Sequence, residues 1–190
     1  GRSILAFDVT TPESPSILWK KGCPNLDNNT GCTGGWEGIG QTWSQVSVLY
    51  ADNYQDANGD LIPLLIVGGG YNDCEDPDNN TTSNHSCSGV TEGNIIYVLN
   101  AYTGAIIETF ATDRPVVGGV TVVPVNENNP RAMFAYATDT GGNIYRIHGG
   151  TVAAPAEFGS SPATSWHIKK IASLGCATPG AACTANRKFL

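Results

Sequence analysis

The sequence predicts an all-β protein that forms part of a β-propeller, with two to three blades of four antiparallel strands. The first observation is the stretch 93–110, GNIIYVLNAYTGAIIETF, in which a β-branched apolar run and an alternating run flank a turn that begins with Asn and ends with Gly. The second is that this pattern recurs from Gly1 and from Gly142, the latter 49 positions after Gly93. That spacing lies within the roughly 40–50 residues of a propeller blade. No long segment has helical periodicity.

We expect the hairpin copies to occupy equivalent places in successive blades. Setting the first copy on the second puts Phe7 on Leu99 and Trp19 near Phe110. The third copy finds its partner strand in residues 165–168.

Two further strands are expected before each complete hairpin. Residues 42–48, TWSQVSV, share their pattern with residues 116–122, VVGGVTV. Each segment is followed by a polar loop and a second apolar run, at 61–67 and 132–137. Each blade would therefore hold two antiparallel strands followed by the hairpin.

The order of these units divides the chain along its length. The expected parts are the last hairpin of one blade (1–19), an insertion that contains Cys23 and Cys32 (20–41), a blade with a second insertion (42–110), another blade (114–171) and a cysteine loop (172–190). Repeats of this kind bury their apolar faces against their neighbours. We therefore expect the remainder of a larger chain, or a partner, to cover the outer faces.

The composition excludes two classes of partner. The formal net charge is -7 over 190 residues, and no Lys/Arg cluster interrupts the acidic surface, which argues against nucleic-acid binding. No apolar run is long enough to cross a membrane as a helix, so no transmembrane segment is expected.

The six cysteines form three near-neighbour pairs: Cys23 with Cys32, Cys74 with Cys87, and Cys176 with Cys183. No CxxC motif occurs and the three histidines are scattered, so a zinc site is unfavoured. The alternatives are disulfides and buried free thiols. The polar, Asn-rich surroundings favour disulfides, and these indicate an oxidising compartment that is secreted, periplasmic or at the cell surface.

Residues 56–62, DANGDLI, have the oxygen spacing of a calcium loop. Asp56, Asn58 and Asp60 would offer side chains and Ile62 its carbonyl, and Asp52 lies close enough upstream to join. No acidic residue occupies the distal bidentate position. A plain β-turn between two strands is therefore the alternative.

Catalytic motifs are absent from the sequence: no serine has the Gly-x-Ser-x-Gly context and no glycine-rich loop precedes a helix. Packing between blades is the expected role of the four tryptophans, with an aromatic ligand platform as the alternative. They are Trp19, Trp36, Trp43 and Trp166.

Together these motifs resemble the C-terminal domain of the PilY1/PilC family of type IV pilus biogenesis proteins and tip adhesins. The segments that carry the resemblance are 1–10 (GRSILAFDVT), 17–19 (ILW), 42–48 (TWSQVSV), 67–72 (VGGGYN), 93–104 (GNIIYVLNAYTG) and 138–147 (TDTGGNIYRI). Their order matches the family's, and they cover roughly residues 1–147.

The resemblance implies a quinoprotein-like propeller, without enzymatic activity, at the outer cell surface or the pilus tip. It implies minor pilins, the pilus tip, and host or abiotic surfaces as partners. It also implies a calcium loop near Asp56, Asn58 and Asp60 that regulates pilus extension and retraction.

Two alternatives share the strand-turn-strand unit: a fragment of a pyrroloquinoline-quinone dehydrogenase, and a propeller of outer-membrane assembly. The dehydrogenase would need a full ring of blades and polar groups around the quinone. Alcohol-dependent dye reduction with added quinone and calcium distinguishes it from the adhesin.

Overall fold

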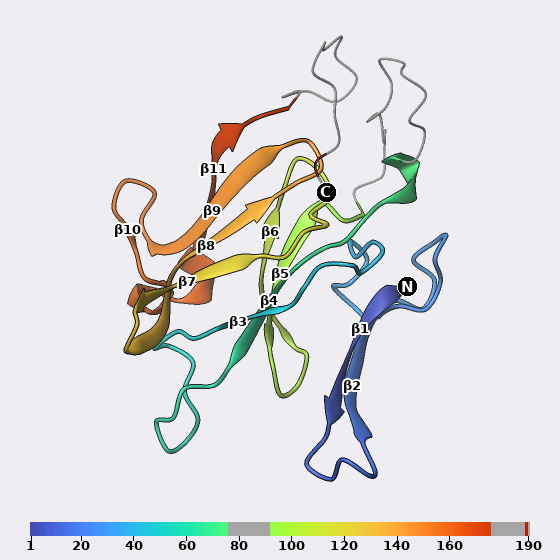
Figure 1. Cartoon of the computed structure of the whole chain (residues 1–190), viewed down its shortest axis with the longest axis horizontal. Coiled ribbons are helices and arrows are strands. Elements are labelled where there is room, and N and C mark those ends of the chain that lie inside the picture. The colour runs from blue at the N-terminus through green and yellow to red at the C-terminus, as the bar shows by residue number, and fades with distance from the viewer. Residues whose placement is uncertain (76–91, 176–188, 190) are drawn as a thin grey trace.

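The structure, a computed structural model, describes residues 1–75, 92–175 and 189, and over these residues it is built from strands (Figure 1). The strands are β1 (Arg2–Asp8), β2 (Ser16–Cys23), β3 (Ser47–Leu49), β4 (Leu64–Gly68), β5 (Ile95–Asn100), β6 (Ile106–Ala111), β7 (Thr121–Asn126), β8 (Asn129–Thr138), β9 (Asn143–Gly150), β10 (Pro155–Ala156) and β11 (His167–Ser173). Three short 3-10 helices accompany them: η1 (Asp73–Glu75), η2 (Phe158–Ser160) and η3 (Ala163–Ser165). No helix in this part of the chain could span a bilayer.

The strands form three antiparallel sheets. The β1–β2 hairpin is one sheet, β3-β4-β5-β6 is the second, and β7-β8-β9-β11 is the third, with β10 also beside β9. In Figure 1 they follow one another from the lower right to the upper left. A four-stranded and a five-stranded antiparallel sheet, together with a hairpin, confirm the predicted fold class, a partial β-propeller.

The central strands β4 and β5 are buried on both faces. Side chains alternate along a strand, so Leu65 and Val67 of β4 contact the core shared with the hairpin, whereas Leu64 and Ile66 contact the core shared with the third sheet. The residues of β5 divide in the same way. We call these cores the hairpin core and the inter-sheet core.

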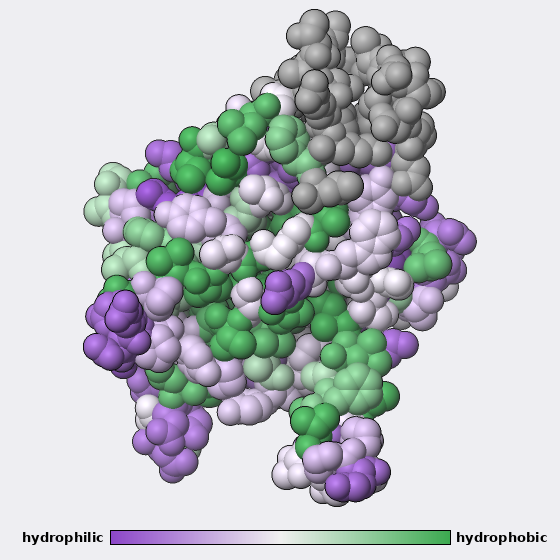
Figure 2. Space-filling view, viewed as in Figure 1, coloured by the Kyte–Doolittle hydropathy of each residue, from purple (hydrophilic) through white to green (hydrophobic). Residues whose placement is uncertain are grey.

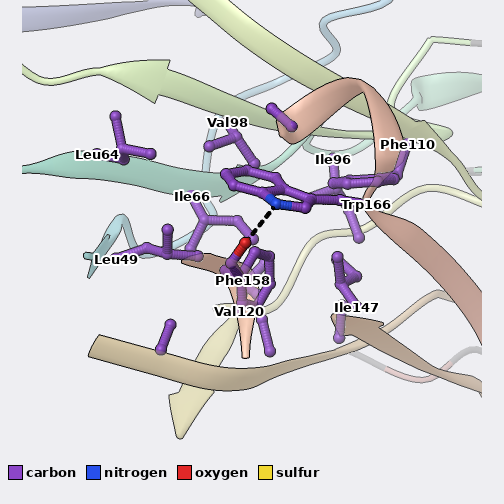
Figure 3. Close-up of a cluster of buried hydrophobic side chains, with 14 of the residues drawn as sticks. Leu49, Leu64, Ile66, Ile96, Val98, Phe110, Val120, Ile147, Phe158 and Trp166 are labelled. Carbon is purple, nitrogen blue, oxygen red and sulfur yellow. Dashed lines mark hydrogen bonds between the residues drawn. The ribbon is translucent and has the colours of Figure 1, made fainter. Parts of the chain in front are cut away.

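Trp166 lies in the middle of the inter-sheet core (Figure 3). Its indole Nε1 donates to the carbonyl of Phe158 at 2.8 Å and to that of Ser161 at 3.0 Å. The Phe158 ring meets the indole edge-on, with centroids 4.8 Å apart. Because the only hydrogen-bond donor of the indole is satisfied, Trp166 stabilises the core through its apolar area without leaving an unpaired polar group buried.

The hairpin core is smaller and is built around two other tryptophans. Trp36 stacks on Tyr97 with centroids 4.7 Å apart. Trp19 donates from Nε1 to the carbonyl of Ala101 at 3.0 Å and lies against Gly104. A Cβ on Gly104 would be 2.7 Å from the Trp19 ring, and its φ of 66° is itself a conformation that favours glycine.

The first strands of the second and third sheets are shorter or later than expected. Residues 42–46 and 116–120 are connectors rather than strands. Thr42 N donates to the Gly1 carbonyl, and Val116 N to the Gly93 carbonyl, both at 3.0 Å. Residues 42–48 and 116–122 therefore occupy equivalent places. The first part of each segment is not a strand, however, but a connector that bonds to the start of the preceding hairpin.

The first two hairpin copies superpose with one adjustment. Phe7 and Leu99 both directly follow a β-bulge, as equivalent residues should. Trp19 takes the place of Glu108, not of Phe110, because the turn of the first copy is longer.

The third copy is shifted by one residue from the predicted alignment. Tyr145 takes the place of Tyr97, because both rings face the preceding sheet. The cause is the tight loop 139–142, which Asp139 closes by accepting the amide protons of Gly141 and Asn143, each at 3.0 Å. The partner strand begins at His167, later than predicted.

Candidate calcium loop and interaction surfaces

The predicted calcium loop is an exposed turn between β3 and β4. Asp56 Oδ1 accepts the amide protons of Asn58 at 2.8 Å and of Asp60 at 3.0 Å, and Asp56 N donates to the Asp60 carbonyl at 2.8 Å. The amides of Asp60 and Asn58 lower the pKa of Asp56, because they stabilise its charged form. Gly59 supplies the positive φ of 85° that the turn requires.

The donor set fits calcium only in part. Asp52 forms an ion pair with Arg131 of β8, so its carboxylate is already engaged by a residue outside the turn. Asp56, Asn58, Asp60 and the Ile62 carbonyl remain, whereas calcium takes about six to eight oxygens. The described residues contain no group of three or more His, Cys, Asp or Glu that could hold a metal. Calcium binding in this turn stays a prediction.

The insertion 20–41 is stapled as predicted. Cys23 and Cys32 form a disulfide with their Cα atoms 4.0 Å apart. Cys74 is also disulfide-bonded. Its predicted partner Cys87, and the predicted pair Cys176–Cys183, lie outside the described residues.

A buried arginine that the sequence analysis missed organises the stapled insertion. Arg2 Nε donates to the Ile39 carbonyl at 2.7 Å. Its terminal nitrogens donate to the Asn28 carbonyl at 3.0 Å and to Asn29 Oδ1 at 2.7 Å. Glu92 completes the set with an ion pair at 2.9 Å. The sequence feature that could have revealed this role is an arginine within an apolar strand, because arginine is rarely buried unless it is paired.

The hairpin β1–β2 exposes an apolar face, which we call the hairpin face. Its members are Leu5, Phe7, Val9, Ile17 and Leu18. Figure 2 shows hydrophobic side chains over this hairpin at the lower right. Leu5 and Phe7 are the equivalents of Tyr97 and Leu99, which are fully buried in the next sheet. The hairpin face thus presents core-type residues to solvent.

A groove of about 650 Å³ lies between two sheet edges. Residues 45–48 around β3 form one wall and residues 119–122 around β7 form the other. Both strands are edge strands. Ser47 Oγ bridges the walls by donating to the Val120 carbonyl at 2.6 Å.

Trp43 departs from the predicted inter-blade packing. It is 61 % exposed and stacks on Tyr71 with centroids 5.2 Å apart. The other three tryptophans lie between sheets, as predicted.

Comparison with known proteins bears on the fold. No family model and no curated protein sequence matches the chain. The crystal structure of the Pseudomonas aeruginosa PilY1 C-terminal domain is similar, with a TM-score of 0.53 and 21 % identity. The chain has a PilY1-like fold. The similarity covers 89 % of this chain but 30 % of the PilY1 chain, so the described protein corresponds to less than a third of that neighbour's length.

Proposed function

We propose that this chain is a non-enzymatic module of type IV pilus assembly and adhesion, acting outside the cell. The PilY1-like fold and the Cys23–Cys32 disulfide support this proposal. The observation that carries it is the hairpin face, because exposed contiguous apolar residues mark interaction surfaces.

The proposed partner at the hairpin face is a minor pilin or another component of the pilus tip. Phe7 and Ile17 are cross-strand partners and are 53 % and 58 % exposed. Fully burying an exposed side chain of this size contributes about 1.5–3 kcal/mol, so Phe7 and Ile17, which are already partly buried, would each contribute about half of that on binding. Two such residues at the centre of a patch are enough to dominate a small interface.

The test is made in the organism that encodes the chain. We expect the double variant Phe7→Asp/Ile17→Asp to lower the number of surface pili, twitching motility and attachment, because two carboxylates in an apolar interface cannot be desolvated. Tyr102→Asp is the matched control, since Tyr102 is 64 % exposed in the equivalent turn of the β5–β6 hairpin.

Thermal melts of the purified variants establish that both remain folded. Normal piliation, motility and attachment in a strain lacking the whole gene would contradict the proposal. If the Tyr102 variant lost pili to the same degree, the effect would not be specific to the hairpin face, and the hairpin face could not be the proposed binding surface.

A further inference from the structure

Two histidines meet on the face of the third sheet that points away from the inter-sheet core. His148 of β9 and His167 of β11 are directly paired across the two strands. Their ring centroids are 5.8 Å apart, with the planes inclined at 45°. Directly opposed residues of neighbouring strands have Cβ atoms about 4.5–5.5 Å apart, so both rings can reach a common point.

His148 is prepared as a ligand by its backbone contact. Its Nδ1 lies 2.6 Å from the carbonyl of Gly149, which can only accept, so the ring proton sits on Nδ1. Nε2 then carries a lone pair. The side chain is fully buried, and Nε2 has no hydrogen-bond partner. A backbone carbonyl that fixes one ring nitrogen while the other stays free is the usual arrangement of metal-binding histidine.

The separation of the rings suits one ion between them. Metal–nitrogen bonds to imidazole are about 2.0–2.1 Å long in tetrahedral sites. Adding the distance from each nitrogen to its ring centre places two coordinated rings roughly 5–6 Å apart. The observed 5.8 Å lies in this range. His167 is half-buried, which gives the ion a path from solvent.

The charged neighbours set the limits of such a site. Arg146 and Lys169 are cross-strand partners on the same face, and Arg146 lies over the Phe134 ring at 5.4 Å. Burial first, and then these cations together with His167, lower the pKa of His148. The imidazole is therefore neutral at physiological pH, as a ligand must be. The same cations weaken the attraction of a second positive charge.

We propose that His148 and His167 form a two-imidazole site for a borderline divalent transition metal such as Zn²⁺ or Ni²⁺. The described residues bring no third His, Cys, Asp or Glu to the ion, so water that enters on the side of the half-buried His167 completes its coordination. Neutral nitrogen ligands select these ions over calcium, which takes oxygen ligands. The ion ties the edge strand β11 to β9, independently of the turn at residues 56–62.

The experiment titrates the purified, oxidised chain with ZnCl₂ and separately with NiCl₂ at pH 7.5, using calorimetry and thermal melts. We expect one ion per chain, a dissociation constant on the order of micromolar, and a higher melting temperature. A large excess of calcium leaves binding unchanged.

Three variants locate the site. His167→Gln weakens binding at least about tenfold, and His148→Gln does the same if it folds. His85→Gln, which removes the third histidine of the sequence, leaves binding intact. His167 is half-buried, so its variant stays folded and decides the question alone. Absence of saturable binding, or binding that survives His167→Gln, overturns the proposal.

Discussion

The two cores of the molecule differ in how they are held. The inter-sheet core joins the four-stranded second sheet to the five-stranded third sheet and consists of aliphatic and aromatic side chains around Trp166. The hairpin core joins a two-stranded sheet to a four-stranded one, and it adds a disulfide and the buried Arg2 to its apolar contacts. A two-stranded sheet has too little apolar area to hold its place alone, so covalent and charged contacts supply the remainder.

The largest expected effect is in the inter-sheet core. Trp166→Ala should lower the free energy of unfolding by about 3–5 kcal/mol, because it leaves a cavity and removes the indole donor from two carbonyls. Chemical denaturation measures it. Trp43→Ala is the control, since the exposed Trp43 loses only its stacking on Tyr71, at most about 1.5 kcal/mol. Equal losses would show that the two tryptophans do not differ in role.

The disulfide comes next. Replacing both Cys23 and Cys32 by Ser should cost roughly 2–3 kcal/mol, because the unfolded chain regains the freedom of a short loop. The loss should be local. Hydrogen exchange should accelerate in β1 and β2 while the amides of β8 and β9 stay protected. Uniform acceleration across all sheets would mean that the two cores unfold together.

Two equivalent tyrosines sharpen the same contrast. The Tyr145 hydroxyl donates to Asp139 Oδ2 and accepts from Asp113 N, both at 2.9 Å. The buried Tyr97 hydroxyl has no hydrogen-bond partner. Tyr145→Phe should therefore cost about 1–3 kcal/mol, whereas Tyr97→Phe should change stability by less than about 0.5 kcal/mol or raise it. The reverse order in denaturant melts would refute this assignment.

The smallest expected effect concerns the turn at residues 56–62. If the turn binds calcium, Asp60→Ala should abolish any calcium-dependent rise in melting temperature and leave metal-free stability within about 0.5 kcal/mol. Asp52→Asn is the control that should keep the rise, since Asp52 is paired with Arg131. An undiminished rise in the Asp60 variant would exclude the turn as the calcium site.

The parts of the fold that could be predicted are those with local patterns. The β5–β6 hairpin was predictable because β-branched residues, a turn and a returning strand are contiguous in sequence. The shift of Tyr145 onto Tyr97 was not, because both copies share the letters GNI, yet β9 begins one residue after Gly142 and β5 begins two residues after Gly93. Residues 42–46 have the pattern of a strand, but they form a connector in which Thr42 N donates to the Gly1 carbonyl at the start of the first hairpin.

The site residues follow the same division. The Cys23–Cys32 pair was predictable from spacing and polar surroundings. The role of Arg2 was not, because most of its acceptors are backbone carbonyls in an irregular insertion that has no residue signature. The pairing of His148 with His167 depends on strand register across an irregular connection, which no sequence period encodes.

The burial of β4 and β5 on both faces has a consequence for folding fidelity. In a sheet with one solvent-exposed face, a shift of a strand by one residue exposes its apolar side chains to water, and this exposure destabilises the shifted pairing. Here a slip of β5 would only exchange the residues destined for the two cores, with Tyr97 moving to the side now filled by Ile96 and Val98. Hydrophobicity alone cannot reject that misalignment. The bulge before Leu99 and the specific contacts of each core, such as the stacking of Tyr97 on Trp36, favour the native pairing.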